Sequence, residues 1–306
     1  MLITIGFDGQ ESPDVFALDL TRTIGTPVDA FEAKLLWSEE AADAARNCER
    51  VRIYADGQLV FTGVADEVSV QVGTHGRVLE VAGRGLAAVM MRVEQSGREF
   101  AVAGWADIKK RLVDECGITA ETEVGALSSL RRFVITSGVS SWKALCDWAG
   151  AAGMIAPGFS ADGVLLLRRK GSGKLKLDAA SAIFSAERRT VRDGAVSEVL
   201  IRERTTGRQT VVKSDELKAR GVSGRAVIAA SKGTLESRIP EARWMLERSR
   251  RGFDRFSVEL AGGFACEPGD EAECSVDGLP EHCRVDSVRT IFGEDGVRCV
   301  VEGFVE

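Results

Sequence analysis

The sequence predicts a mainly β protein of the α+β class, in which two small β-barrel domains flank a small α+β domain. Short stretches of period-two alternation fill the first third of the chain and return in its last third. Apolar residues at helical spacing are confined to the middle and to one segment near residue 240. A chain of 306 residues is longer than one that usually folds around a single hydrophobic core. We therefore expect domains at 1–95, 96–172 and 173–306, with a helical insertion in the last near 214–254.

The first predicted domain consists of closely spaced strands and tight turns. Residues 51–54 alternate between apolar and polar, and residues 59–64 form the return strand after Asp56-Gly57, a strong hairpin signal. A further alternating strand follows at 68–72. Short strands joined by tight turns are typical of a small barrel or sandwich. Residues 38–46 fit either a short helix or a solvated loop.

The middle segment changes period. Residues 105–116 carry apolar side chains at helical spacing, and Gly117 supplies a left-handed stop. Ser140 or Ser141 can cap a second helix. The apolar stripe of this second helix contains Trp142, Leu145, Cys146, Ala149 and Ala152. Short strands are expected at 132–136, 154–156 and 164–169, and a basic linker at 170–174.

The last segment returns to β structure around one helix. A hairpin is expected over 195–213, and a short strand over 226–230. Ile239-Pro240-Glu241 begins a helix, since proline suits the first turn and glutamate complements the helix dipole. The remaining expected strands are 256–260, 271–276, 284–290 and 297–304.

Composition and charge exclude several classes of function. The net charge of −6 argues against wrapping nucleic acid or docking on an anionic membrane, although nucleic acid can pass through an acidic lumen without sticking. The N-terminus lacks the pattern of a signal peptide, and no apolar run approaches the roughly 18 residues of a membrane span. We therefore expect no membrane insertion and free thiols in a reducing cytoplasm.

Three stretches resemble a known family in their order and spacing. The first is the hairpin pair VRIYADGQLVFTGV at 51–64 with its continuation at 66–68 and 79–85. The second is the helix VSSWKALCDWAGAAGM at 139–154. The third is the Arg-rich helix at 240–251, with a strand at 256–260 and the turn at 267–270. Together they resemble the phage tail hub family, which includes the Mu-like baseplate hub, the late control D family and the hub portion of type VI secretion spike proteins.

The resemblance implies a structural hub of a bacteriophage tail tip or baseplate, with no catalysis and no cofactor. It implies a homotrimeric ring that joins the tail tube to the central spike and lets DNA pass. The implied partners are further copies of the chain, a tail tube or distal tail protein, a spike or tip protein and a tape measure protein. The implied location is the virion tail, with assembly in the host cytoplasm. Two alternatives are a cell-wall-degrading tail enzyme and the hub of a contractile secretion or bacteriocin particle.

Four cysteines crowd the end of the chain: Cys266, Cys274, Cys283 and Cys299. A four-thiolate zinc or iron–sulfur site usually contains a Cys-x₂-Cys pair, and none is present. The last three alternate with nearby valines, so we expect buried thiols, and keep a metal cluster as the alternative. His282 beside Cys283 is expected in a surface turn rather than on a metal. His75 is likewise expected in a solvated turn.

No motif in the sequence indicates catalysis. The carboxylate pairs Glu39/Glu40 and Asp270/Glu271 are adjacent in sequence and do not report two carboxylates facing each other across a cleft, so we expect both pairs to be solvated. The Gly-x-Gly runs at 83–85 and 171–173 do not complete a nucleotide-binding fingerprint, which favours tight turns.

An arginine cluster and one tryptophan are the candidate interface residues. Arg243, Arg248, Arg250 and Arg251 lie in or beside the helix that begins at Ile239. They suit a solvated face or an acidic neighbouring subunit better than nucleic acid, and we expect an intersubunit or tube contact. Trp105, Trp142 and Trp148 are expected mainly in the core of the α+β domain. Trp148 falls off the apolar stripe of its helix, so an exposed side chain available to a partner is the alternative for it.

Overall fold

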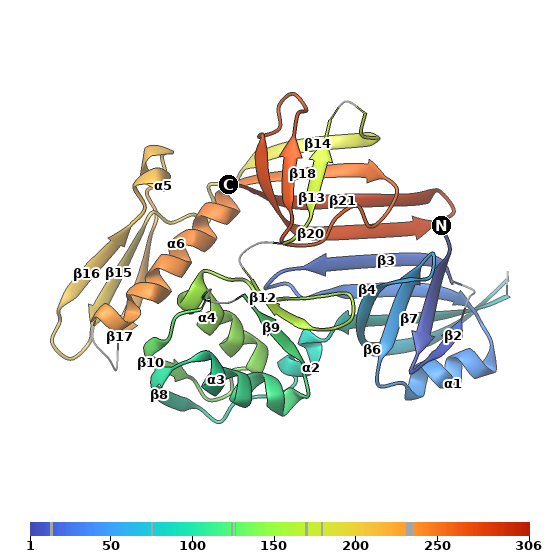
Figure 1. Ribbon diagram of the computed structural model, residues 1–306, viewed down its shortest axis with the longest axis horizontal. Coiled ribbons are helices and arrows are strands. Elements are labelled where there is room, and N and C mark those ends of the chain that lie inside the picture. The colour runs from blue at the N-terminus through green and yellow to red at the C-terminus, as the bar shows by residue number, and fades with distance from the viewer. Residues whose placement is uncertain are drawn as a thin grey trace.

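The computed structural model describes residues 1–12, 15–74, 76–123, 125, 127–168, 171–178, 180–230 and 235–306 (Figure 1). Strands account for 47% and helices for 22% of the structure, which confirms the predicted mainly β, α+β class. His75, Arg169 and Lys170 lie outside the described residues. The predicted turn at His75, the last residue of the strand predicted at 164–169 and the first residue of the linker predicted at 170–174 therefore stay predictions.

Two groups of strands form the β part of the molecule. The N-terminal β unit contains β1 (Ile3–Phe7), β2 (Gln10–Ser12), β3 (Val15–Thr23), β4 (Ala30–Leu36), β5 (Val51–Ala55), β6 (Gln58–Gly73) and β7 (Gly76–Gly85). The C-terminal β unit contains β13 (Lys174–Leu177), β14 (Ile183–Thr190), β18 (Asp254–Ala261), β19 (Glu271–Cys274), β20 (His282–Gly293) and β21 (Gly296–Val305).

The two β units share one hydrogen-bonded sheet. In the described part of the chain this sheet has 13 strands, whose main path runs β14-β18-β21-β20-β3-β4-β7-β6-β5-β1-β2. The junction is the antiparallel pair β20–β3, in register from Ser287 opposite Thr23 to Phe292 opposite Leu18. Strands that were expected in separate barrels therefore lie side by side at this junction (Figure 1).

Local signals explain the strands and the first helix. Asp56 and Gly57 both adopt positive φ (47° and 79°), as the two-residue turn between β5 and β6 requires. The segment that fitted either a helix or a loop is α1 (Glu39–Asn47), capped by the Ser38 hydroxyl, which accepts from the Ala41 N–H at 3.0 Å. Ala42 and Ala45 bury the inner face of α1 in the core of the N-terminal β unit.

The middle segment packs small strands and helices around a core of its own. Its elements are α2 (Ala87–Met91), β8 (Arg98–Ala103), α3 (Trp105–Ile108), a π-helical turn (Lys109–Val113), a 3₁₀ turn (Asp114–Cys116), β9 (Ala120–Thr122), β10 (Leu130–Ile135), α4 (Ser141–Gly153), β11 (Gly158–Phe159) and β12 (Leu165–Leu167). Ser140 caps α4, since its hydroxyl accepts from the Lys143 N–H at 3.2 Å. The predicted helix from Trp105 to Cys116 thus changes pitch twice before Gly117 ends it at φ 66°.

Trp148 lies at the centre of this core. Its side chain is 0% exposed, its indole N–H donates to the Ala103 carbonyl at 3.1 Å, and its ring stacks on Trp105 with centroids 5.8 Å apart. The alternative of an exposed Trp148 is wrong. A residue off the apolar stripe faces solvent only when a helix is covered on one side. Helix α4 is covered on several sides, by α2, β10 and α6 among others, so the position of Trp148 is also buried.

A second, smaller sheet lies at the opposite end of the molecule from α1 (Figure 1). It consists of β16 (Gln209–Lys213), β15 (Glu198–Glu203) and β17 (Arg225–Ala230), with β15 in the middle. The short helix α5 (Asp215–Ala219) follows β16, and a 3₁₀ turn (Leu235–Arg238) leads into α6 (Ile239–Phe253). Val199, Ile201, Ala242 and Leu246 form the core between this sheet and α6.

Candidate functional site at the arginine junction

Helix α6 is the element on which three parts of the molecule meet. One side of it covers the β16-β15-β17 sheet, and its C-terminal end reaches β18 and β21 (Figure 1). The helix also crosses α4 closely, since a Cβ on Gly150 would lie 2.2 Å from the indole nitrogen of Trp244. Only glycine fits at this crossing without moving one of the two helices.

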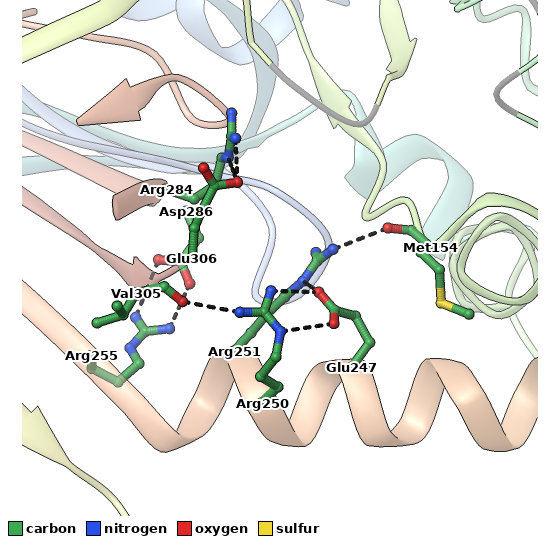
Figure 2. Close-up of polar contacts among 9 residues, drawn as sticks. All are labelled: Met154, Glu247, Arg250, Arg251, Arg255, Arg284, Asp286, Val305 and Glu306. Carbon is green, nitrogen blue, oxygen red and sulfur yellow. Dashed lines mark hydrogen bonds and ion pairs between the residues drawn. The ribbon is translucent and has the colours of Figure 1, made fainter. Parts of the chain in front are cut away.

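Arg250 and Arg251 tie the end of α6 to two other elements (Figure 2). Arg250 donates to the Val305 carbonyl at 3.1 Å, which links α6 to β21. Arg251 donates to the Met154 carbonyl at 3.0 Å, which links α6 to the end of α4. Both guanidinium groups also donate to Glu247 on the preceding helical turn, at distances from 2.7 to 3.0 Å. The three side chains form a clamp inside the molecule.

A second group of ion pairs lies beside this clamp on the C-terminal strands (Figure 2). Arg255 binds the Asp286 carboxylate through both terminal nitrogens, at 2.5 and 3.1 Å. Arg284 is buried, donates to the Gly269 carbonyl at 3.1 Å, and pairs with the Glu306 carboxylate. Such bidentate and multiple contacts fix the planes of the guanidinium groups.

The electrostatics of the junction follow from partial burial. Burial raises the pKa of Glu247, but the hydrogen bonds from Arg250 and Arg251 outweigh it, so the pKa lies below the usual range. At Asp286 the balance is reversed, because burial raises the pKa more than Arg255 lowers it. The junction therefore holds Glu247 firmly ionised, whereas part of the attraction between Arg255 and Asp286 offsets desolvation.

A cavity of about 420 Å³ opens between these elements. Its lining combines residues of all three parts, among them Thr23, Phe159, Glu247, Glu267 and Phe304. Cationic and acidic side chains both line it, namely Arg168, Arg250, Arg251 and Arg284 together with Glu247, Glu267 and Glu306. This mixed lining suits packing between parts of the chain more than capture of a ligand of one charge.

The four predicted interface arginines divide into two pairs. Arg243 and Arg248 are exposed on α6, as a solvated helix face requires. Arg250 and Arg251 are largely covered and face the junction, so the prediction of a solvated face does not hold for them. Sequence reasoning missed their partners because two of the acceptors are backbone carbonyls, which no side-chain pattern reports.

The four cysteines pack as apolar residues. Cys274, Cys283 and Cys299 are buried in the core of the C-terminal β unit, and Cys266 packs against that core. The contact of the Cys274 and Cys283 thiols, followed by burial, raises the pKa of Cys283. Within the described residues no three Cys, His, Asp or Glu side chains are grouped as a metal ion would require. His282 is exposed at the start of β20, and the predicted turn ends beside it.

The two acidic pairs differ in their surroundings. Glu39 and Glu40 are exposed in the first turn of α1. Asp270, in contrast, is buried, and its carboxylate accepts from the N–H groups of Gly173 and Glu267, both at 2.9 Å. The prediction of a solvated Asp270 is wrong, because this carboxylate turns inward to accept from backbone N–H groups of two loops. The glycines at 171 and 173 serve this contact, since a Cβ on Gly173 would lie 2.4 Å from the carboxylate.

Replacing Glu247 with glutamine should lower the free energy of unfolding by about 1–3 kcal/mol at neutral pH, since two charge-assisted contacts are weakened together. Because the pKa of Glu247 is lowered in the folded state, its stabilisation is present above the unfolded pKa and is lost as the pH falls through the folded value. Urea unfolding at pH 7 and in acid measures both effects.

Glu241 on the same helix is a matched control, because it pairs with Arg238 at the more exposed N-terminal end of α6. Its change to glutamine should alter stability by less than about 0.5 kcal/mol. Equal losses for the two variants would contradict the role of Glu247 as the centre of the clamp.

Solved structures resemble the chain, although no family model and no curated protein matches its sequence. The tail protein from Neisseria meningitidis MC58 superimposes with a TM-score of 0.76 at 17% identity, over 100% of this chain and 96% of that one. The 43 kDa tail protein of prophage MuSo2 from Shewanella oneidensis gives 0.76 at 16% identity, over 99% and 96% of the two chains.

This chain has the fold of a phage tail protein.

The same fold extends to a secretion machine. The E. coli c3393 protein, a component of the type VI secretion system described as similar to the T4 tail proteins gp27 and gp5, matches with a TM-score of 0.62 at 10% identity, over 99% of this chain and 76% of that one. The resemblance to phage tail hub proteins that the three sequence stretches indicated is thus confirmed at the level of the fold.

Proposed function

We propose that the chain is a structural hub of a bacteriophage tail tip or baseplate, and that it acts by assembly rather than by catalysis. The observation that carries this proposal is the match to phage tail proteins over almost the full length of both chains. A match of that extent covers the sheet, the α+β part and the α6 insertion together. We retain the division into domains at 1–95, 96–172 and 173–306 as part of the proposal.

In this proposal the hub is a homotrimeric ring between the tail tube and the central spike, with DNA passing through the lumen. The continuous β20–β3 junction supports it, because it fixes the two β units of one subunit as a rigid segment of such a ring. The net charge of −6 suits a lumen that does not retain DNA. The exposed Arg243 and Arg248 are proposed contacts to a neighbouring subunit or to the tube.

The proposed partners are further copies of the chain, a tail tube or distal tail protein, a spike or tip protein and a tape measure protein. The proposed location is the virion tail after assembly in the host cytoplasm. No helix in the described ranges has the length and apolar character needed to cross a membrane.

A second candidate is the hub of a contractile secretion or bacteriocin particle. The match to the E. coli type VI secretion component favours it specifically, although with a lower TM-score than the phage tail proteins. The two candidates share the ring and differ in the particle that contains it, so antibody labelling of particles purified from the producing cells separates them.

Light scattering on the purified chain tests the ring. We expect a species with three times the mass of the chain, and negative-stain images of rings with a central hole. A chain that stays monomeric at every concentration reached would contradict self-assembly into a ring.

A further inference from the structure

The β16-β15-β17 sheet has one face without a covering element among the described residues. Because side chains alternate along a strand, Val199 and Ile201 point toward α6 and Leu200 points the other way. Leu200 lies directly opposite Val211 on one side and Val227 on the other. Val211 is 41% and Val227 is 61% exposed, so the three aliphatic side chains form a ridge across the open face.

Basic residues border this ridge. Glu198 precedes it on β15 and is bonded by Lys218 and Arg225 at 2.9 and 2.8 Å, with Lys213 at 3.8 Å. Hydrogen bonds from Lys218 and Arg225 lower the pKa of Glu198 to about 2, so this carboxylate is ionised. Its single negative charge is outnumbered by the three cations around it. Arg202 adds a cation on the other side of the ridge. Over residues 195–230 Lys and Arg outnumber Asp and Glu, although the whole chain is acidic.

The N-terminal β unit carries the complementary surface. Over residues 1–95 Asp and Glu outnumber Lys and Arg. On the outer face of β3, β4, β7 and β6 a hollow of about 420 Å³ lies over Ala30 and Ala82. Ala82 is directly opposite Glu32 on β4 and Glu67 on β6, so two carboxylates flank the small side chain. Asp19 also lines the hollow.

Around this hollow Asp19 is paired with Arg289, and Asp66 is paired with Arg84 and Arg92. Glu32, Glu67 and Glu80 form an acidic group whose nearest cation is Lys34, 3.7 Å from Glu32. Glu80 lies two residues from Ala82 on the same face of β7, and burial followed by its contact with Glu32 raises its pKa. A positively bordered surface that docked here would relieve the repulsion between these side chains. The aliphatic ridge would meet the small side chains of Ala30 and Ala82 in this hollow.

We propose that the open face of the β16-β15-β17 sheet of one copy docks into this carboxylate-bordered hollow on the next copy. The β16-β15-β17 sheet is separate from strands β3, β4, β6 and β7, which carry the hollow, so each copy can offer one surface to each neighbour (Figure 1). Such head-to-tail contacts between different patches generate a closed ring when the rotation between copies closes. The inference rests on the proposed function, because it names the contact that joins neighbouring subunits of the ring.

The ridge is tested by Val227→Asp, since this side chain is 61% exposed and its replacement should leave the fold intact. We expect the dissociation constant for self-association, measured by sedimentation velocity, to rise on the order of tenfold or more. The matched control is Val72→Asp, at the exposed tip of the β6–β7 hairpin, which should leave self-association unchanged. Thermal unfolding of both variants should remain close to that of the unchanged chain.

The hollow is tested by Glu32→Lys with Glu67→Lys, which should weaken self-association similarly. Adding Arg202→Glu to that double variant should restore part of the lost self-association, because the charges on both surfaces are then exchanged. Self-association of the unchanged chain should also weaken at high salt.

The outcomes separate this contact from the ring itself. If Val227→Asp and the double variant Glu32→Lys with Glu67→Lys form a ring as stable as that of the unchanged chain, the proposed docking is wrong. The ring itself is then unaffected, and the open sheet face would bind another protein. A chain that never self-associates overturns both.

Discussion

Replacing Trp148 with alanine is expected to lower the free energy of unfolding by about 3–5 kcal/mol, the range for truncation of a fully buried aromatic side chain. The indole is 0% exposed, stacks on Trp105 and donates to the Ala103 carbonyl, so the substitution removes packing and leaves a buried acceptor unpaired. Urea unfolding followed by circular dichroism measures the loss.

Phe184→Ala is the matched control for Trp148→Ala. Phe184 lies on the edge strand β14 and is 66% exposed, so its truncation should change stability by less than about 0.5 kcal/mol. If Trp148→Ala left stability intact and weakened only assembly, Trp148 would be a contact to a partner and not a residue of the buried core.

Asp29→Asn is expected to change the pH dependence of stability. Asp29 is 7% exposed and accepts from the Thr23 N–H at 2.6 Å, and burial raises its pKa to about 6 despite the nearby Arg22. Because the folded pKa is raised, the folded state retains a proton that the unfolded state releases, and stability falls as the pH rises from about 4 to about 6. This loss is on the order of 3 kcal/mol.

Asparagine keeps an oxygen that can accept from Thr23 but cannot ionise. The stability of Asp29→Asn relative to the unchanged chain should therefore rise by up to about 3 kcal/mol between pH 4 and pH 7, as measured by urea unfolding at each pH. Asp66→Asn supplies a control, because hydrogen bonds from Arg84 and Arg92 lower the pKa of Asp66, so its difference should change little between pH 4 and pH 7 and should change with the opposite sign only in more acid solution. A difference for Asp29→Asn that stays constant with pH would refute the raised pKa.

Local patterns predicted most of the fold. Period-two alternation and the turn residues located the hairpin through Asp56 and Gly57, and the proline at 240 marked the beginning of α6. These signals suffice because they act over a few residues, where backbone preference and burial on one face agree.

The candidate site was only partly predictable, since its contacts join residues far apart in the chain. Arg243 and Arg250 belong to the same basic run, yet only the second meets a carbonyl more than fifty residues away. The burial of Asp29 and Asp270 likewise depends on loops that the chain brings together only after folding. Residue type alone does not report which backbone groups will face a side chain.

The β20–β3 junction has a consequence for the order in which the chain can fold. Arg289 on β20 binds Asp19 on β3 across a separation of 270 residues. During synthesis the edge of β3 stays unpaired until β20, more than 250 residues later, has left the ribosome, and contacts of such high sequence separation form slowly. Until then an open strand edge is available to the wrong partner, including the β20 of another nascent chain. Yield of the correctly folded subunit should therefore depend on keeping newly made chains apart.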